Sequence, residues 1–119
     1  MHISYKQAFH ALYWTLNDQF SRNPSLGLGE IASDMCPYTF KDGNSADPAS
    51  WYDFCDCCKE VEKELEAQGL ELSEVETAFR CGTRYMRFFH DSFGYDLEEA
   101  IKDLSFEKFK IAYEYDYGF

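Results

Sequence analysis

The chain has 119 residues and a formal net charge of −11, because 22 acidic side chains outnumber 11 lysines and arginines. This length suits one domain over residues 1–119, and 45% hydrophobic residues are enough for a real core, which excludes a disordered chain. The negative charge is repelled by nucleic acid phosphates and anionic membranes, so we expect neither as a direct partner. The same field attracts a basic protein.

The N-terminal sequence carries no secretory signal, because the polar start at Met1 to Ser4 runs directly into an amphipathic segment. No apolar run approaches the ~20 residues of a membrane span. The five cysteines are an odd number, which favours free thiols in a reducing cytosol. We therefore expect a cytoplasmic protein.

Hydrophobic periodicity and capping signals predict an all-α, single-domain bundle of about five helices. The first helix begins at Ser4, which forms a capping box with Gln7, and stops at Asn23-Pro24. A short second helix follows. A loop over 37–46 then separates it from the third helix, and Tyr38–Phe40 is a candidate extended piece within that loop.

The third helix has the clearest start signal, because Asp47 is a natural N-cap and Pro48 occupies the first helical position. Gly69 is its expected end. Cys57 is expected to point away from the core. The core stripe of this helix consists of Trp51, Phe54, Cys55, Cys58, Val61 and Leu65.

The fourth helix starts with a capping box from Ser73 to Glu76, and its core stripe runs inward as far as Phe93, just before Gly94 ends it. A short fifth helix is capped by Asp96. The first two helices resemble the fourth and fifth, which suggests a duplicated long-helix/short-helix unit with the third helix packed between the copies. Chance similarity of amphipathic helices is the alternative.

The C-terminal segment is ambiguous. Ser105, Phe106, Phe109 and Tyr113 fit a helix, whereas the aromatic alternation from Phe109 to Phe119 is strand periodicity. A strand needs a partner, and only the Tyr38–Phe40 region offers one. We expect a helical turn or two from Ser105 and then an extended aromatic tail.

No catalytic site is expected, because the chain lacks the common nucleotide-binding, metalloprotease and hydrolase motifs. Zinc sites space their ligands on turns and in pairs, whereas the cysteines around Cys55 lie within a helix and have no second pair. We therefore expect no metal and no cofactor. A small metal-binding protein or enzyme that uses Cys55, Cys58 and a distant histidine stays open as an alternative.

Two features point to a protein partner. An acidic ridge on the third helix places side chains of the same charge at helical spacing. A basic partner relieves the repulsion between them. The members of the ridge are Asp53, Asp56, Glu60 and Glu64. A basic strip on the fourth helix, formed by Arg80, Arg84 and Arg87, competes for these acids within the chain. The second feature is the aromatic and acidic tail, with residues Tyr113, Glu114, Tyr115, Asp116 and Tyr117. Closure of the tail over the core is the alternative.

Three stretches of the chain form a pattern found in small bacterial proteins: Ala8–Leu12, Leu28–Met35 and Gly43–Trp51. The pattern resembles acidic proteins encoded beside polymorphic toxins, including the immunity proteins of contact-dependent growth inhibition. The resemblance implies a cytosolic immunity protein that binds and neutralises a basic toxin domain, such as a nuclease. An acidic nucleic-acid mimic is the alternative within the same class.

Overall fold

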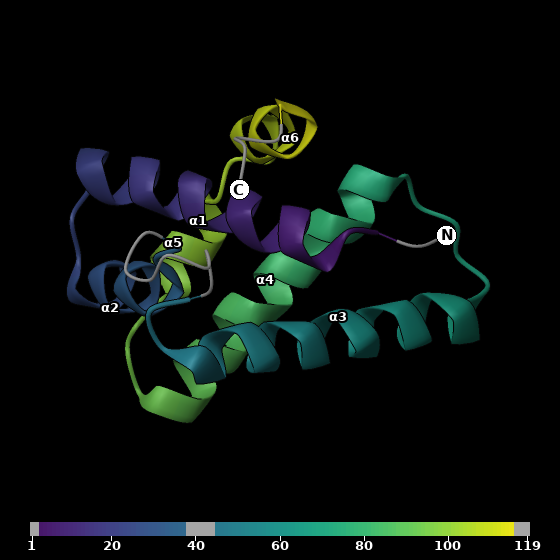
Figure 1. The fold of residues 1–119 in the computed structure, drawn as a ribbon, viewed down its shortest axis with the longest axis horizontal. Helices are drawn as coiled ribbons and strands as arrows, with labels where there is room; N and C mark the ends of the chain where they lie inside the picture. The colour runs from purple at the N-terminus through teal and green to yellow at the C-terminus, as the bar shows by residue number, and fades with distance from the viewer. Residues whose placement is uncertain (1–2, 38–44, 116–119) are drawn as a thin grey trace.

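The computed structural model of the chain describes residues 3–37 and 45–115. These residues contain six α-helices and no strand (Figure 1). The helices are α1 Tyr5–Arg22, α2 Leu26–Met35, α3 Pro48–Gln68, α4 Glu74–Phe93, α5 Glu98–Asp103 and α6 Phe106–Tyr115. The prediction of an all-α bundle is confirmed, with a sixth helix where we expected a mostly extended tail.

Most of the predicted capping signals set the helix ends. Ser4 and Asp47 each accept a hydrogen bond from a backbone N–H in the first turn of the following helix. Ser73 forms the complete capping box expected at the start of α4. Gly69 and Gly94 end α3 and α4 in the left-handed conformation, which a residue with a Cβ rarely adopts.

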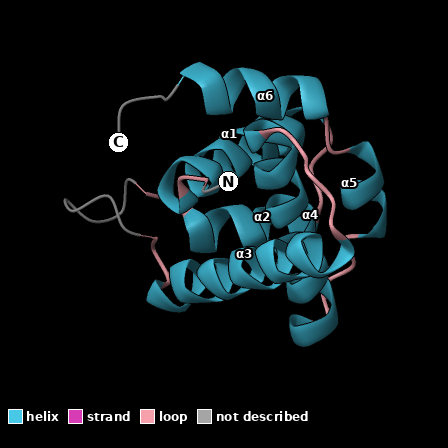
Figure 2. Ribbon diagram, turned by 90° about the vertical axis from the view of Figure 1, so that its right-hand side faces the viewer, coloured by secondary structure: helices cyan, strands magenta, loops and turns pink. Residues whose placement is uncertain are grey.

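One hydrophobic core draws on all six helices, and α4 crosses it in contact with α1, α3 and α6 (Figure 2). The rings of Phe9, Phe54 and Tyr85 meet edge to face, with centroid distances of 5.2 and 5.7 Å. Helix α1 packs directly on α4 at Gly82, where a Cβ would lie 3.2 Å from Leu12 Cδ1. Helix α3 contacts α1, α2 and α4, and its packing between the two proposed copies stays a prediction.

The chain continues as helix α6 as far as Tyr115, so the prediction of an extended tail after the first helical turn or two is wrong. Phe109, Ala112 and Tyr113 fall on one helical face and are buried, whereas Ile111 and Tyr115 of the alternating pattern are exposed. The Gln7 side-chain amide also donates to the Tyr113 carbonyl oxygen at 2.5 Å. The proposed strand partner at Tyr38–Phe40 lies outside the described residues.

Helix α5 begins one residue later than predicted. Its N-cap position is Leu97, and Asp96 instead accepts a hydrogen bond from the Glu98 N–H at 3.1 Å. His90 Nδ1 of α4 accepts the Leu97 N–H at 3.1 Å, so a side chain of another helix satisfies the N–H of the N-cap residue. The duplication of a long-helix/short-helix unit stays a prediction.

Candidate protein-binding surface

The C-terminal half of the acidic ridge pairs with an arginine of the same chain. Arg84 of α4 donates from Nη2 to Glu64 Oε2 at 2.5 Å, and its Nη1 lies 4.0 Å from Glu60 Oε1. The hydrogen bond from Arg84 holds the pKa of Glu64 below its ordinary range. Arg84 is therefore the residue of the basic strip that pairs with the ridge within the protein.

The other two arginines of the strip form no ion pair with the described residues of the ridge. Arg87 donates two hydrogen bonds to the Glu98 carboxylate of α5, at 2.7 and 3.2 Å. Arg80 forms no ion pair within residues 3–37 and 45–115. Within the basic strip, Arg84 therefore pairs with the ridge, whereas Arg87 pairs with α5.

The N-terminal half of the ridge keeps its charge. Asp53 and Asp56 form no ion pair with any described residue. Partial burial raises the pKa of Asp53, and the negative charges of Asp56 and Asp47 raise it further. Burial and the charge of Asp47 also raise the pKa of Asp34 at the end of α2. These carboxylates repel one another, and a cation placed among them relieves the repulsion.

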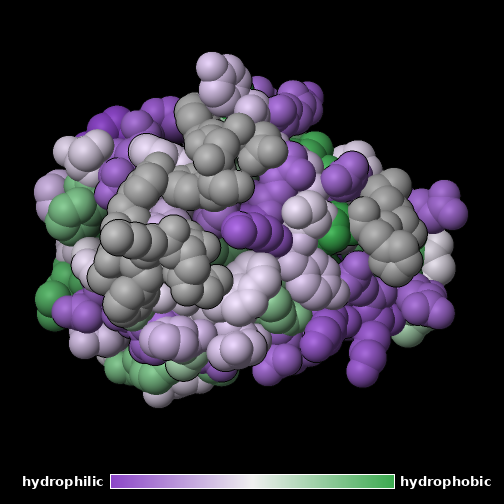
Figure 3. Space-filling model, in the orientation of Figure 1, coloured by the Kyte–Doolittle hydropathy of each residue, from purple (hydrophilic) through white to green (hydrophobic). Residues whose placement is uncertain are grey.

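Aromatic rings connect the core to the surface near this charged half. Tyr85 is buried, and burial raises the pKa of its hydroxyl, with a smaller contribution from the charge of Asp53. Its ring stacks on Phe88 at a centroid distance of 6.2 Å, and Phe88 meets Phe93 edge to face at 6.1 Å. Phe93 is 54% exposed, so its predicted inward position is wrong. Figure 3 shows apolar side chains at the surface over the end of α4, at the lower left.

Tyr52 adds an exposed ring on α3 itself, 67% accessible and one helical turn before Asp56. Aromatic anchors beside charged groups are common in the centres of protein interfaces. We call this set the acidic–aromatic face, and its members are Tyr52, Asp53, Asp56, Phe88 and Phe93. Sequence reasoning overlooked its rings, although the adjacent pair Phe88-Phe89 signals that one ring must turn away from the core.

The C-terminal aromatic tail offers less than predicted. Tyr113 is 4% exposed, and its hydroxyl donates to Glu74 Oε1 at 2.6 Å. Its ring therefore closes over the core and does not face a partner, as the alternative interpretation held. Glu114 and Tyr115 are exposed on α6. Asp116 and Tyr117 lie outside the described residues.

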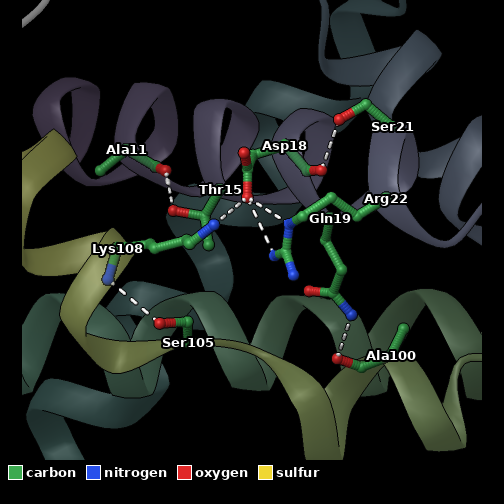
Figure 4. A network of polar contacts seen from close by, with 9 residues as sticks. All are labelled: Ala11, Thr15, Asp18, Gln19, Ser21, Arg22, Ala100, Ser105 and Lys108. Carbon is green, nitrogen blue, oxygen red and sulfur yellow. Dashed lines mark hydrogen bonds and ion pairs between the residues drawn. The ribbon is translucent and has the colours of Figure 1, made fainter.

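Polar contacts with α1 fix the position of α6. The Asp18 carboxylate accepts hydrogen bonds from Lys108 Nζ of α6 at 2.8 Å and from Arg22 at 2.9 Å (Figure 4). These two donors hold the pKa of Asp18 below its ordinary range. One turn of α1 thus anchors α6 on the side of α1 away from α3 (Figures 1 and 2).

The cysteines are packed as small apolar side chains. Cys57 is buried, which corrects the prediction that it points away from the core, and burial raises its pKa to about 12. The pKa of Cys58 is also raised, first by its contact with the Cys81 thiol. High thiol pKa values disfavour the thiolate that nucleophilic or metal-binding chemistry requires. In the described part of the chain, no three histidine, cysteine or acidic side chains form a metal-binding group.

Two further observations concern the whole described chain. Its helices are all too short or too polar to cross a membrane. The chain matches no protein-family model, no curated protein and no solved structure.

Proposed function

We propose that this chain is a cytoplasmic immunity-type protein that binds and neutralises a basic toxin domain through its acidic–aromatic face. The observation that carries the proposal is the division of the ridge. Arg84 pairs closely with Glu64 and lies at 4.0 Å from Glu60, whereas Asp53 and Asp56 have no ion-pair partner among the described residues. The exposed ring of Tyr52 adjoins Asp53 in α3, so a partner at this end of the helix gains both charge pairing and apolar contact.

The partner in this proposal is a basic protein domain. A net charge of −11 accelerates the encounter with such a domain, and the charged half of α3 orients it. Tyr52 and Phe93 supply exposed apolar area, which slows dissociation once water is excluded. Covering a toxin's active site or substrate path then requires only a one-to-one complex. Because Arg84 interrupts the row of free carboxylates, the ridge supports a protein partner better than nucleic-acid mimicry.

The test measures binding to the purified product of the neighbouring gene by surface plasmon resonance at low and high salt. Replacing Asp53 and Asp56 by asparagine removes two charges from the face. Since close charge pairs across interfaces contribute about 1.5 kcal/mol or more, the expected loss is at least about tenfold in affinity. The Asp103→Asn/Glu107→Gln variant removes the same charge from exposed positions of α5 and α6 and serves as the matched control.

Three results oppose the proposal. If the neighbouring protein does not bind, the immunity function is wrong. If both double variants weaken binding equally, only the net charge matters and the face is not the site. If the Asp103→Asn/Glu107→Gln variant alone weakens binding, the partner docks beside α5 and α6 and the face is not the site.

A further inference from the structure

A groove of about 620 Å³ lies at the end of α3 opposite to the acidic–aromatic face. Its walls are the last turns of α3, the connection that follows Gly69, and the first turns of α4. Nothing lies within 4 Å of the point where a Cβ on Gly69 would sit, so the groove is open there. Its volume falls in the range of about 300–1,000 Å³ that is typical of ligand pockets.

The floor of the groove is apolar. Leu65 is buried, Leu72 is half-buried and packs against the core, and Leu70 remains 48% exposed beside them. Leaving such a side chain in water costs free energy that an apolar occupant recovers at roughly 25 cal/mol per Å² covered. The floor therefore fits a hydrocarbon chain.

The rim of the groove is acidic. Glu62, Glu66 and Glu71 line it, and the described residues provide no ion pair to any of the three. Glu62 accepts a hydrogen bond from the Tyr5 hydroxyl, which fixes this carboxylate at the inner wall. Three carboxylates around a leucine floor attract a cation at the end of a hydrocarbon chain and repel an anion.

We infer that this groove receives a lysine side chain of the bound protein, with its methylene groups on the leucines and its ammonium group among the three glutamates. Lysine combines a flexible apolar stem with a compact charge, which matches this floor and rim. The inference rests on the proposed function, because it takes the occupant from the same basic protein. The 21 residues of α3 span about 30 Å, so one partner of ordinary interface size reaches both ends of the helix.

The first test uses short peptides and does not need the natural partner. The ¹⁵N-labelled protein is titrated with acetyl-Leu-Lys-Leu amide, with acetyl-Leu-Gln-Leu amide and with hexylammonium. The lysine peptide is expected to shift the amide signals of Leu65, Leu70 and Thr77 in a saturable way, several-fold more tightly than the glutamine peptide. Shifts confined to other parts of the protein overturn the inference. Hexylammonium carries an apolar stem and an ammonium group without a peptide, so it is expected to shift the same signals. If it shifts them no more than the glutamine peptide does, the inference is overturned.

The second test uses the complex. Glu66→Gln/Glu71→Gln is expected to weaken binding of the neighbouring gene product about fivefold, in line with two partly exposed charge contacts. The Asp103→Asn/Glu107→Gln variant is again the control. If the groove variant binds normally while Asp53→Asn/Asp56→Asn does not, the groove inference fails and the proposed function stands. If no complex forms with the wild-type protein, the proposed function fails, and saturable peptide binding still decides what the groove accepts.

Discussion

Two carboxylates on the same face of α3 are predicted to affect stability in opposite directions. Asp53→Asn removes a charge that Asp56 and Asp47 repel, so the variant is expected to be more stable than the wild type at pH 7. Glu64→Gln removes the hydrogen-bonded partner of Arg84, so that variant is expected to be less stable. Each substitution removes one negative charge, and only the local surroundings differ.

The gain for Asp53→Asn is worked from its neighbours. A like-charge pair at this helical spacing costs about 0.2–0.5 kcal/mol, and Asp56 lies three residues away. Asp47 adds a second repulsion, and partial exposure of Asp53 keeps the sum near 0.5 kcal/mol. The helix dipole opposes this gain weakly, because it acts within the first turn and Asp53 lies in the second. A gain of this size raises the melting temperature by about 2 °C.

The assay is thermal and urea unfolding of wild type and both variants between pH 3 and pH 7. Because folding raises the pKa of Asp53, its ionised form opposes folding, and this cost appears as the pH rises from about 3.9 through the folded pKa. Because folding lowers the pKa of Glu64, its contribution is lost as the pH falls through the folded pKa. Both variants should therefore approach the wild type at pH 3. A destabilised Asp53→Asn protein at pH 7 refutes the repulsion, and with it the argument for an uncompensated face.

Three further predictions concern the fold. Gly27→Ala should destabilise the protein more than Gly29→Ala. A Cβ on residue 27 would lie 2.8 Å from the Asp96 backbone oxygen, whereas a Cβ on residue 29 would meet only a ring atom of Phe20 at 3.2 Å. Equal melting temperatures of the two variants would contradict this. Tyr113→Phe should cost about 0.5–1.5 kcal/mol in urea unfolding by removing the hydrogen bond to Glu74, and an unchanged midpoint would mean that α6 is not fixed there. A thiol reagent should label the buried Cys57, Cys58 and Cys81 only after denaturation. Rapid labelling of these thiols in the native protein would disprove their burial.

The sequence determined most of the local structure, because the signals are local. Asp47-Pro48 and the Ser73 capping box fix where α3 and α4 start, since each satisfies N–H groups within its own first turn. Gly69 ends α3 for the equally local reason that its φ is 64°. The acidic ridge was also visible, because helical spacing alone places its four members on one side of α3.

Only the tertiary structure decided which carboxylates remain uncompensated. The spacing of Arg80, Arg84 and Arg87 on one helix does not reveal that Arg84 pairs with the ridge while Arg87 turns to α5, because that choice depends on where α3 crosses α4. The same holds for the rings. Phe93 continues the inward stripe of α4 in sequence, yet it is exposed because the helix extends past the edge of the core, and burial depends on the neighbouring helices and not on periodicity alone.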